Sequence, residues 1–138
     1  MQKYEILPHT ADLRLKVSGG SLIELFSASL EGMNCILKND FKKFHITGEL
    51  TDKLEISSLD ESMLLIDFLS EILTLSHKNK ACYKINGFEI LDYSKIKAEI
   101  EGSRIDGFDE DIKAVTYTEA KIVKNNLNQL ETIIVFDI

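Results

Sequence analysis

The stretch SLDESMLLIDFLSEILTL, residues 58–75, decides the fold class because it carries the clearest helical pattern in the chain. Its apolar residues recur at helical spacing and cover a broad face, which predicts a helix packed against a sheet. Ser58 followed by Glu61 is typical of a capping box, so we expect the helix to begin there. The predicted apolar face consists of Leu65, Phe68, Leu69, Ile72, Leu73 and Leu75.

On the C-terminal side of this helix, β-prone segments follow one another with no further helical pattern. Turn residues separate the segments, and alternation of apolar and polar residues is typical of strands. A run of consecutive strands favours an antiparallel or mixed sheet. The predicted strands are CYKINGFEIL (82–91), KIKAEIEG (95–102), IKAVTYTEAKIV (112–123) and QLETIIVFDI (129–138).

On the N-terminal side, a second helix is predicted from Ser21 to Leu37. Ser21 with Glu24 forms another capping box, and apolar residues follow on one face. The segments YEIL (4–7), LRLKV (13–17), FHITGEL (44–50) and KLEIS (53–57) are predicted to be extended. The sequence therefore predicts one α+β domain over residues 1–138, in which two main helices pack on a mixed or antiparallel sheet.

The charge balance restricts the partners of the protein. The net charge is −7, from 23 acidic and 16 basic residues, and there is no run of Lys or Arg. This argues against tight direct binding of nucleic acid and favours a cation or a basic protein surface. No stretch resembles a signal peptide or a membrane span, so we expect a cytoplasmic protein. Cys35 and Cys82 lack ligand spacing and are expected to be buried, reduced thiols.

Acidic residues lie at both ends of the chain. Asp12 follows the turn PHTA (8–11), and Asp137 and Ile138 end the last predicted strand. Taken separately, Asp12 would bond its own turn and Asp137 would be solvated. Domain termini often lie close together, however. If they meet here, two side chains and the terminal carboxylate of Ile138 would offer oxygen ligands to Ca²⁺, Mg²⁺ or Mn²⁺. His9 as an additional ligand would favour Zn²⁺ or Mn²⁺.

Four motifs together resemble the archease family over essentially the whole chain. They are YEILPHTADLRLKV (4–17), SMLLIDFLSEILTL (62–75), IKAVTYTEAKIV (112–123) and the terminal VFDI (135–138). The resemblance implies a protein that assists the GTP-dependent tRNA-splicing and RNA-repair ligase. Archeases promote guanylylation of the active-site histidine of that ligase and allow it to turn over repeatedly, so the resemblance predicts an activator and not an enzyme.

The resemblance also implies roles for particular residues. The metal-binding positions of the family fall on Asp12, Asp137 and Ile138, with Ca²⁺ the expected ion and Mg²⁺ or Mn²⁺ as functional alternatives. Lys113 and Glu71 match residues that look important for activation of the ligase. Many relatives have His where this chain has Thr118, so a contact made by that His must here be replaced or dispensable.

Two alternatives remain open from the sequence. One is a chaperone or modulator of an RNA-modifying enzyme such as a tRNA methyltransferase, in which a metal only joins the termini. The other is a stand-alone metal-dependent hydrolase, in which the carboxylates and an ion activate water. The hydrolase is disfavoured because the sequence shows no nucleophile with a partner base and no GxSxG or phosphate-binding loop.

Overall fold

The computed structural model describes residues 2–7 and 12–138, and every structural statement below refers to these residues. Their elements are β1 (Lys3–Leu7), β2 (Asp12–Gly19), α1 (Leu22–Leu37), the 3₁₀ helix η1 (Phe41–Lys43), β3 (Leu50–Ser57), α2 (Glu61–Asn79), β4 (Ala81–Leu91), β5 (Lys95–Arg104), β6 (Ala114–Thr116), β7 (Val123–Lys124) and β8 (Leu130–Asp137).

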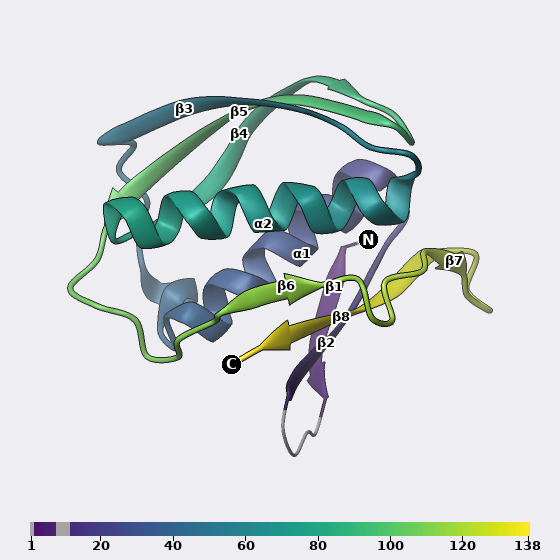
Figure 1. Cartoon of the computed structure of the whole chain (residues 1–138), viewed down its shortest axis with the longest axis horizontal. Helices are drawn as coiled ribbons and strands as arrows, with labels where there is room; N and C mark the ends of the chain where they lie inside the picture. Colours follow the sequence, from purple (N-terminus) through teal and green to yellow (C-terminus); the bar gives the residue numbers. More distant parts are fainter. Residues whose placement is uncertain (1, 8–11) are drawn as a thin grey trace.

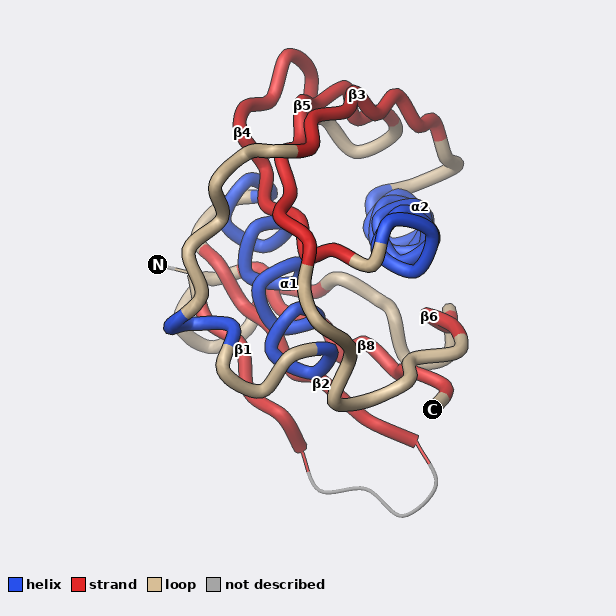
Figure 2. Tube along the Cα trace, turned by 90° about the vertical axis from the view of Figure 1, so that its left-hand side faces the viewer, coloured by secondary structure: helices blue, strands red, loops and turns tan. Residues whose placement is uncertain are grey.

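The strands form two sheets, and the two helices lie between them (Figures 1 and 2). The first sheet has the order β1-β2-β8-β6, with β7 also paired to β8, and the second has the order β3-β5-β4. Every strand pair is antiparallel. The predicted α+β fold with two helices packed on antiparallel strands is confirmed, and the strands divide between two sheets rather than forming one.

Each helix contacts both sheets, so the core is continuous. Helix α1 contacts β1, β2 and β8 of the first sheet and β4 of the second, whereas α2 contacts β6 and all three strands of the second sheet. Phe26 and Phe68 join the helices with ring centroids 5.5 Å apart. Gly32 lets α1 approach β2 closely, because a Cβ there would lie 2.5 Å from a methyl carbon of Leu15.

The first helix starts as the sequence predicts. The backbone N–H of Glu24 donates to Oγ of Ser21 at 3.3 Å, which satisfies one of the free donors of the first turn. The Glu24 carboxylate reaches back to the backbone N–H of Gly20 at 3.3 Å. Reciprocal bonds of this kind define a capping box. Here the glutamate accepts from Gly20, the residue before the N-cap, instead of from the N-cap residue Ser21 itself.

The predicted start of the second helix is wrong by two residues. Asp60, not Ser58, is the N-cap of α2, since its carboxylate accepts a hydrogen bond from the backbone N–H of Met63 at 2.9 Å. The hydroxyl of Ser58 instead donates to Oδ2 of Asp67 at 2.5 Å. An Asp at the N-cap also places negative charge at the positive end of the helix dipole.

The predicted strand 44–50 is also wrong except at its last residue, since β3 begins at Leu50. The backbone N–H of Thr47 donates to Oγ of Ser103 at 2.6 Å instead of to a neighbouring strand. Gly48 has a φ of 78°, in the left-handed region that a regular strand does not occupy. The chain therefore reaches the second sheet through an irregular segment.

The predicted strand 112–123 consists of two short strands, β6 and β7, separated by a loop. The loop leaves the sheet, and its side chains bond to β2 and α2, as described below.

Of the two cysteines, Cys82 is buried as predicted, whereas Cys35 is only half-buried, with its Sγ 3.2 Å from the hydroxyl oxygen of Tyr4. None of the helices in the described ranges is long and apolar enough to cross a membrane.

Candidate functional site

Asp12 and Asp137 lie directly opposite each other where the central strands β2 and β8 meet. The neighbouring pair, Leu13 and Phe136, is buried in the core. Side chains alternate along a strand, so Asp12 and Asp137 both point away from the core, and both are exposed. Opposite residues of an antiparallel pair have Cβ atoms about 4.5–5.5 Å apart, so two carboxylates share one small region of the surface.

Lys113 approaches the same region from the other side of β8. Ala114 of β6 pairs with Asp137, and the backbone N–H of Lys113 donates to the carbonyl oxygen of Asp137 at 2.7 Å. The Lys113 side chain is exposed. Within the described part of the chain its ammonium group makes no ion pair, so it is available to a partner.

Ile138 follows Asp137 and anchors the end of β8. Its side chain is half-buried and packs against the core, so the residue is held beside Asp137. The described residues contain no group of three or more His, Cys, Asp or Glu side chains that could hold a metal. A cation at this place would therefore need further ligands, such as water, besides the two aspartates.

This donor set fits a hard cation. Carboxylate oxygens are the ligands that Ca²⁺, Mg²⁺ and Mn²⁺ prefer, and an exposed site leaves room for water ligands. Two carboxylates that share a surface region repel each other, and a cation removes that repulsion. His9, the additional ligand considered from the sequence, lies outside the described residues.

Glu71 is not brought to this region by a strand pair or by a neighbouring residue of one. It lies on the exposed side of α2, whose opposite face is buried. No hydrogen bond or ion pair between described residues joins Glu71 to Asp12, Asp137 or Lys113. The structure thus groups Asp12, Asp137, Ile138 and Lys113 and leaves Glu71 on a neighbouring element.

Arg14 and Glu119 form a clamp that no local pattern of the sequence indicates. Nε and Nη2 of Arg14 donate to the two carboxylate oxygens of Glu119 at 2.8 and 3.0 Å. Hydrogen bonding and attraction to Arg14 lower the pKa of Glu119, and the same contact raises the pKa of Arg14. Arg14 lies on the outward face of β2, two residues from Asp12, so the clamp holds the loop after β6 beside the acidic pair.

A second contact fixes the start of that loop. The hydroxyl of Tyr117 donates to Oδ1 of Asp67 on α2, and this bond raises the pKa of Tyr117. Thr116 Oγ1 donates to the carbonyl oxygen of Val135 at 3.0 Å. The exposed Thr118 therefore lies between two attached residues, Tyr117 and Glu119.

Comparison with known proteins identifies relatives along the whole chain. The model of the Archease protein family matches residues 4–138. A protein archease of Methanosarcina barkeri is 33% identical over 133 residues, which cover 89% of this chain and 88% of that protein. A protein archease-like of Caenorhabditis elegans is 33% identical over 129 residues, which cover 88% of this chain and 81% of that protein.

Two solved structures share the fold. Protein 1598 of Methanobacterium thermoautotrophicum has a TM-score of 0.76 and covers 98% of each chain at 21% identity. An archease from Thermotoga maritima, described as a possible chaperone, has a TM-score of 0.63 at 19% identity and covers 96% of this chain and 94% of its own. At these identities the likeness establishes the arrangement of helices and strands.

Proposed function

Because this chain belongs to the archease family, we propose that it activates the GTP-dependent tRNA-splicing and RNA-repair ligase as a metal-dependent accessory protein. In this function it promotes guanylylation of the active-site histidine of the ligase and restores the ligase for further rounds. The observation that carries the proposal is the pairing of Asp12 with Asp137, one residue before Ile138. The description of the Thermotoga maritima neighbour as a possible chaperone fits an accessory role on a partner protein.

Asp12, Asp137 and the carboxylate of Ile138 would hold a Ca²⁺, Mg²⁺ or Mn²⁺ ion at the end of β8. When bound, the ion supplies positive charge that can neutralise phosphate oxygens during nucleotidyl transfer. The protein residues hold their positions because β2, β8 and β6 pair there, and such positioning is the main requirement of nucleotidyl transfer. The ammonium of Lys113, which makes no ion pair with any described residue, is suited to contact the ligase or its nucleotide.

The net charge of −7 supports a protein partner with a basic cleft. A ligase that binds RNA needs positive charge in its active-site cleft, because the RNA backbone is an anion. An acidic accessory protein is steered towards such a cleft without binding RNA itself. Glu71, exposed on α2, is proposed to contribute to this contact.

The experiment follows the covalent ligase–GMP adduct over time, with this protein added at a small fraction of the ligase concentration, together with GTP and divalent metal. Wild type is compared with Asp12→Asn, Asp137→Asn, Lys113→Gln and a variant that carries a Gly-Ser tail after Ile138. We expect wild type to accelerate the adduct and all four variants to lose most of the effect.

Matched controls separate the site from general charge effects. Glu99→Gln and Lys53→Gln change exposed charges of β5 and β3 and should leave the activation intact. Calcium titration followed by calorimetry tests the site directly, with binding expected for wild type and lost in Asp12→Asn. If folded wild type neither accelerates the adduct nor supports repeated ligation, the ligase proposal is wrong and a chaperone function for another enzyme replaces it.

A further inference from the structure

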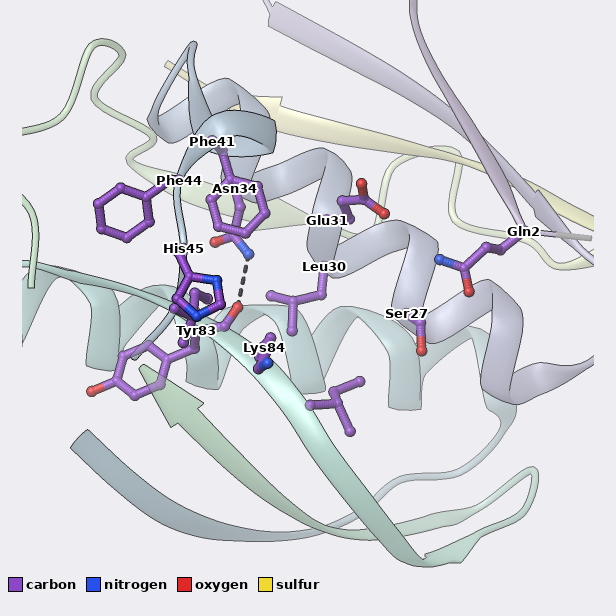
Figure 3. A pocket seen from close by; sticks show the side chains of 12 residues that line it. Gln2, Ser27, Leu30, Glu31, Asn34, Phe41, Phe44, His45, Tyr83 and Lys84 are labelled. Carbon is purple, nitrogen blue, oxygen red and sulfur yellow. Dashed lines mark hydrogen bonds between the residues drawn. The ribbon is translucent and has the colours of Figure 1, made fainter. Parts of the chain in front are cut away.

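A hollow of about 320 Å³ lies on the other side of α1 from β2, away from the acidic pair (Figure 3). Ser27, Leu30, Glu31 and Asn34 of α1 form one wall, since residues three and four apart share a helix face. The segment 41–46 and residues 83–85 of β4 form the others. The volume is at the lower end of the range for small-molecule sites, and no residue of the acidic pair lines it.

Asn34 is the unusual residue of the hollow. It is 1% exposed, and its Nδ2 donates to the carbonyl oxygen of Tyr83 at 2.8 Å. If the amide were flipped, Oδ1 of Asn34 would face the carbonyl oxygen of Tyr83, and two acceptors would repel each other. This hydrogen bond therefore fixes the orientation of the side chain. Oδ1 then has no hydrogen-bond partner in the described structure. A buried acceptor left without a donor costs about 1–3 kcal/mol, so the fold keeps this acceptor at a cost.

The carboxylate of Glu31 is another unpaired acceptor of the hollow, and it is an anion. The side chain is half-buried, and among residues 2–7 and 12–138 it makes no hydrogen bond or ion pair. Among the described residues, Lys84 is the only Lys that lines the hollow, and it already pairs with Glu101 at 3.1 Å. The hollow therefore offers at least two unpaired acceptors, one of them an anion, while the ammonium group of Lys84 is engaged elsewhere.

The remaining lining is aromatic. Phe41 and Phe44 are both half-buried. Phe41 belongs to η1, and Phe44 begins the segment 44–50 that the sequence wrongly predicts to be a strand. Their rings stand beside Asn34 and His45 in Figure 3. Aromatic faces attract organic cations and cover the apolar stem of a bound amine. This explains why two large apolar side chains stay partly exposed on a segment outside both sheets.

We propose that this hollow binds a small organic cation, a primary amine or guanidinium group on an apolar stem. Glu31 is the ion partner at its open side, and the aromatic rings of Phe41 and Phe44 flank the stem. The unpaired Oδ1 of Asn34, which is covered in this structure, receives an N–H of the cation once neighbouring side chains of the hollow shift. Two sources carry this chemistry, a free polyamine and an Arg or Lys side chain of a partner protein. The site is independent of the proposed ligase activation.

The test titrates the full-length protein with spermidine, with capped arginine amide and with capped norleucine amide, which has a similar stem but no charge. Amide nuclear magnetic resonance spectra report the side-chain NH₂ of Asn34, and calorimetry gives the affinity. Glu31→Gln is compared with Glu99→Gln, which removes the same charge from an exposed position on β5 outside the hollow. A thermal melt checks that both variants are folded.

We expect saturable binding of a charged probe, a shift of the Asn34 resonances, and binding about tenfold weaker in Glu31→Gln than in Glu99→Gln, as for loss of one charge-assisted hydrogen bond. Binding of spermidine alone identifies a free polyamine, and binding of capped arginine alone identifies a partner side chain. Equal weakening in both variants, equal binding of the uncharged probe, or no saturable binding at all overturns the proposal and leaves a solvent-filled hollow.

Discussion

Arg14 holds Glu119 by two hydrogen bonds, although 105 positions separate them in the sequence. Arg14 belongs to the strand that carries Asp12, and Glu119 belongs to the loop between β6 and β7. The clamp therefore joins the proposed metal site to the loop that follows Lys113. A forked pair of this kind fixes orientation better than a single contact, because two parallel bonds restrict rotation.

Replacing Arg14 by Lys should loosen the loop without unfolding the protein. Lys keeps the charge but cannot form the fork, and an exposed ion pair contributes little to global stability. Hydrogen exchange of residues 117–122 should become faster, while exchange in α1 and α2 stays unchanged. Lys16→Arg on the same strand is the control. Unchanged exchange in the loop would show that other contacts hold it.

The clamp should also respond to acid. Its carboxylate has a pKa below the ordinary 4.5, so the contact is complete above that pH and is lost as the pH falls through the lowered value. The protection of the loop amides in wild type, corrected for the intrinsic exchange rate, should therefore decrease as the pH falls through this lowered pKa. In Glu119→Gln this acid-dependent loss of protection should be absent, and the loop amides should be weakly protected at every pH. An equally large loss of protection in Glu119→Gln would assign it to another carboxylate.

Tyr117 should ionise at a higher pH than an ordinary tyrosine. Its hydroxyl donates to the carboxylate of Asp67, and deprotonation would remove that donor. Because the folded pKa lies above 10, the contact is complete at neutral pH and is lost as the pH rises through the folded pKa. Ultraviolet titration of wild type against Tyr117→Phe isolates its signal. Asp67→Asn should shift that signal to lower pH, and an unmoved titration would contradict the hydrogen bond.

Cys82 should resist alkylation in the folded protein. Burial raises the pKa of this thiol to about 12, so almost no reactive thiolate exists near neutral pH. Cys35→Ser leaves Cys82 as the single thiol, and iodoacetamide should label it only after denaturant is added. Cys82→Ser leaves the half-buried Cys35 for comparison, which should react faster. Rapid labelling of Cys82 in native protein would mean that β4 opens readily.

Gly32→Ala should destabilise the protein even though Ala favours helices by about 1 kcal/mol over Gly. The new Cβ would lie 2.5 Å from a methyl carbon of the buried Leu15 side chain, so either this side chain or the packing of α1 on β2 must shift. Overpacking of this kind costs about 1–3 kcal/mol of the free energy of unfolding, measured by urea denaturation. Gly87→Ala is the matched control, since nothing lies within 4 Å of its added Cβ. Equal stability of the two variants would contradict the close approach.

The sequence predicted the parts of the fold that depend on local pattern. Helix α1 and its cap at Ser21, the apolar face of α2 and the strands β4, β5 and β8 all follow from periodicity and capping residues. The division of the strands into two sheets could not be predicted, because alternation along a strand does not identify its partner. The cap at Asp60 was missed because Ser58 with Glu61 offered an equally good local pattern.

The candidate site was predicted in part. The positions of Asp12 and Asp137 near the two ends of the sequence predicted a shared site on the condition that the ends meet, and the strand register shows that their backbones do meet. Their role as metal ligands stays a prediction. Arg14, Glu119, Asp67 and Tyr117 carried no local signal of their contacts, because each partner lies far away in the sequence. The same holds for the hollow beside Asn34, which depends on an irregular segment that no repeating pattern describes.

The pairing of β2 with β8 has a consequence for the order of folding. It joins residues 12–19 to residues 130–137, whereas β4 and β5 meet across the short turn at Asp92. Closing a long loop costs more chain entropy and slows the contact. Amides of β4 and β5 should therefore be protected before those of β2 and β8 in pulse-labelled refolding. The acidic pair would then assemble in a late step, and simultaneous protection of both sheets would contradict this order.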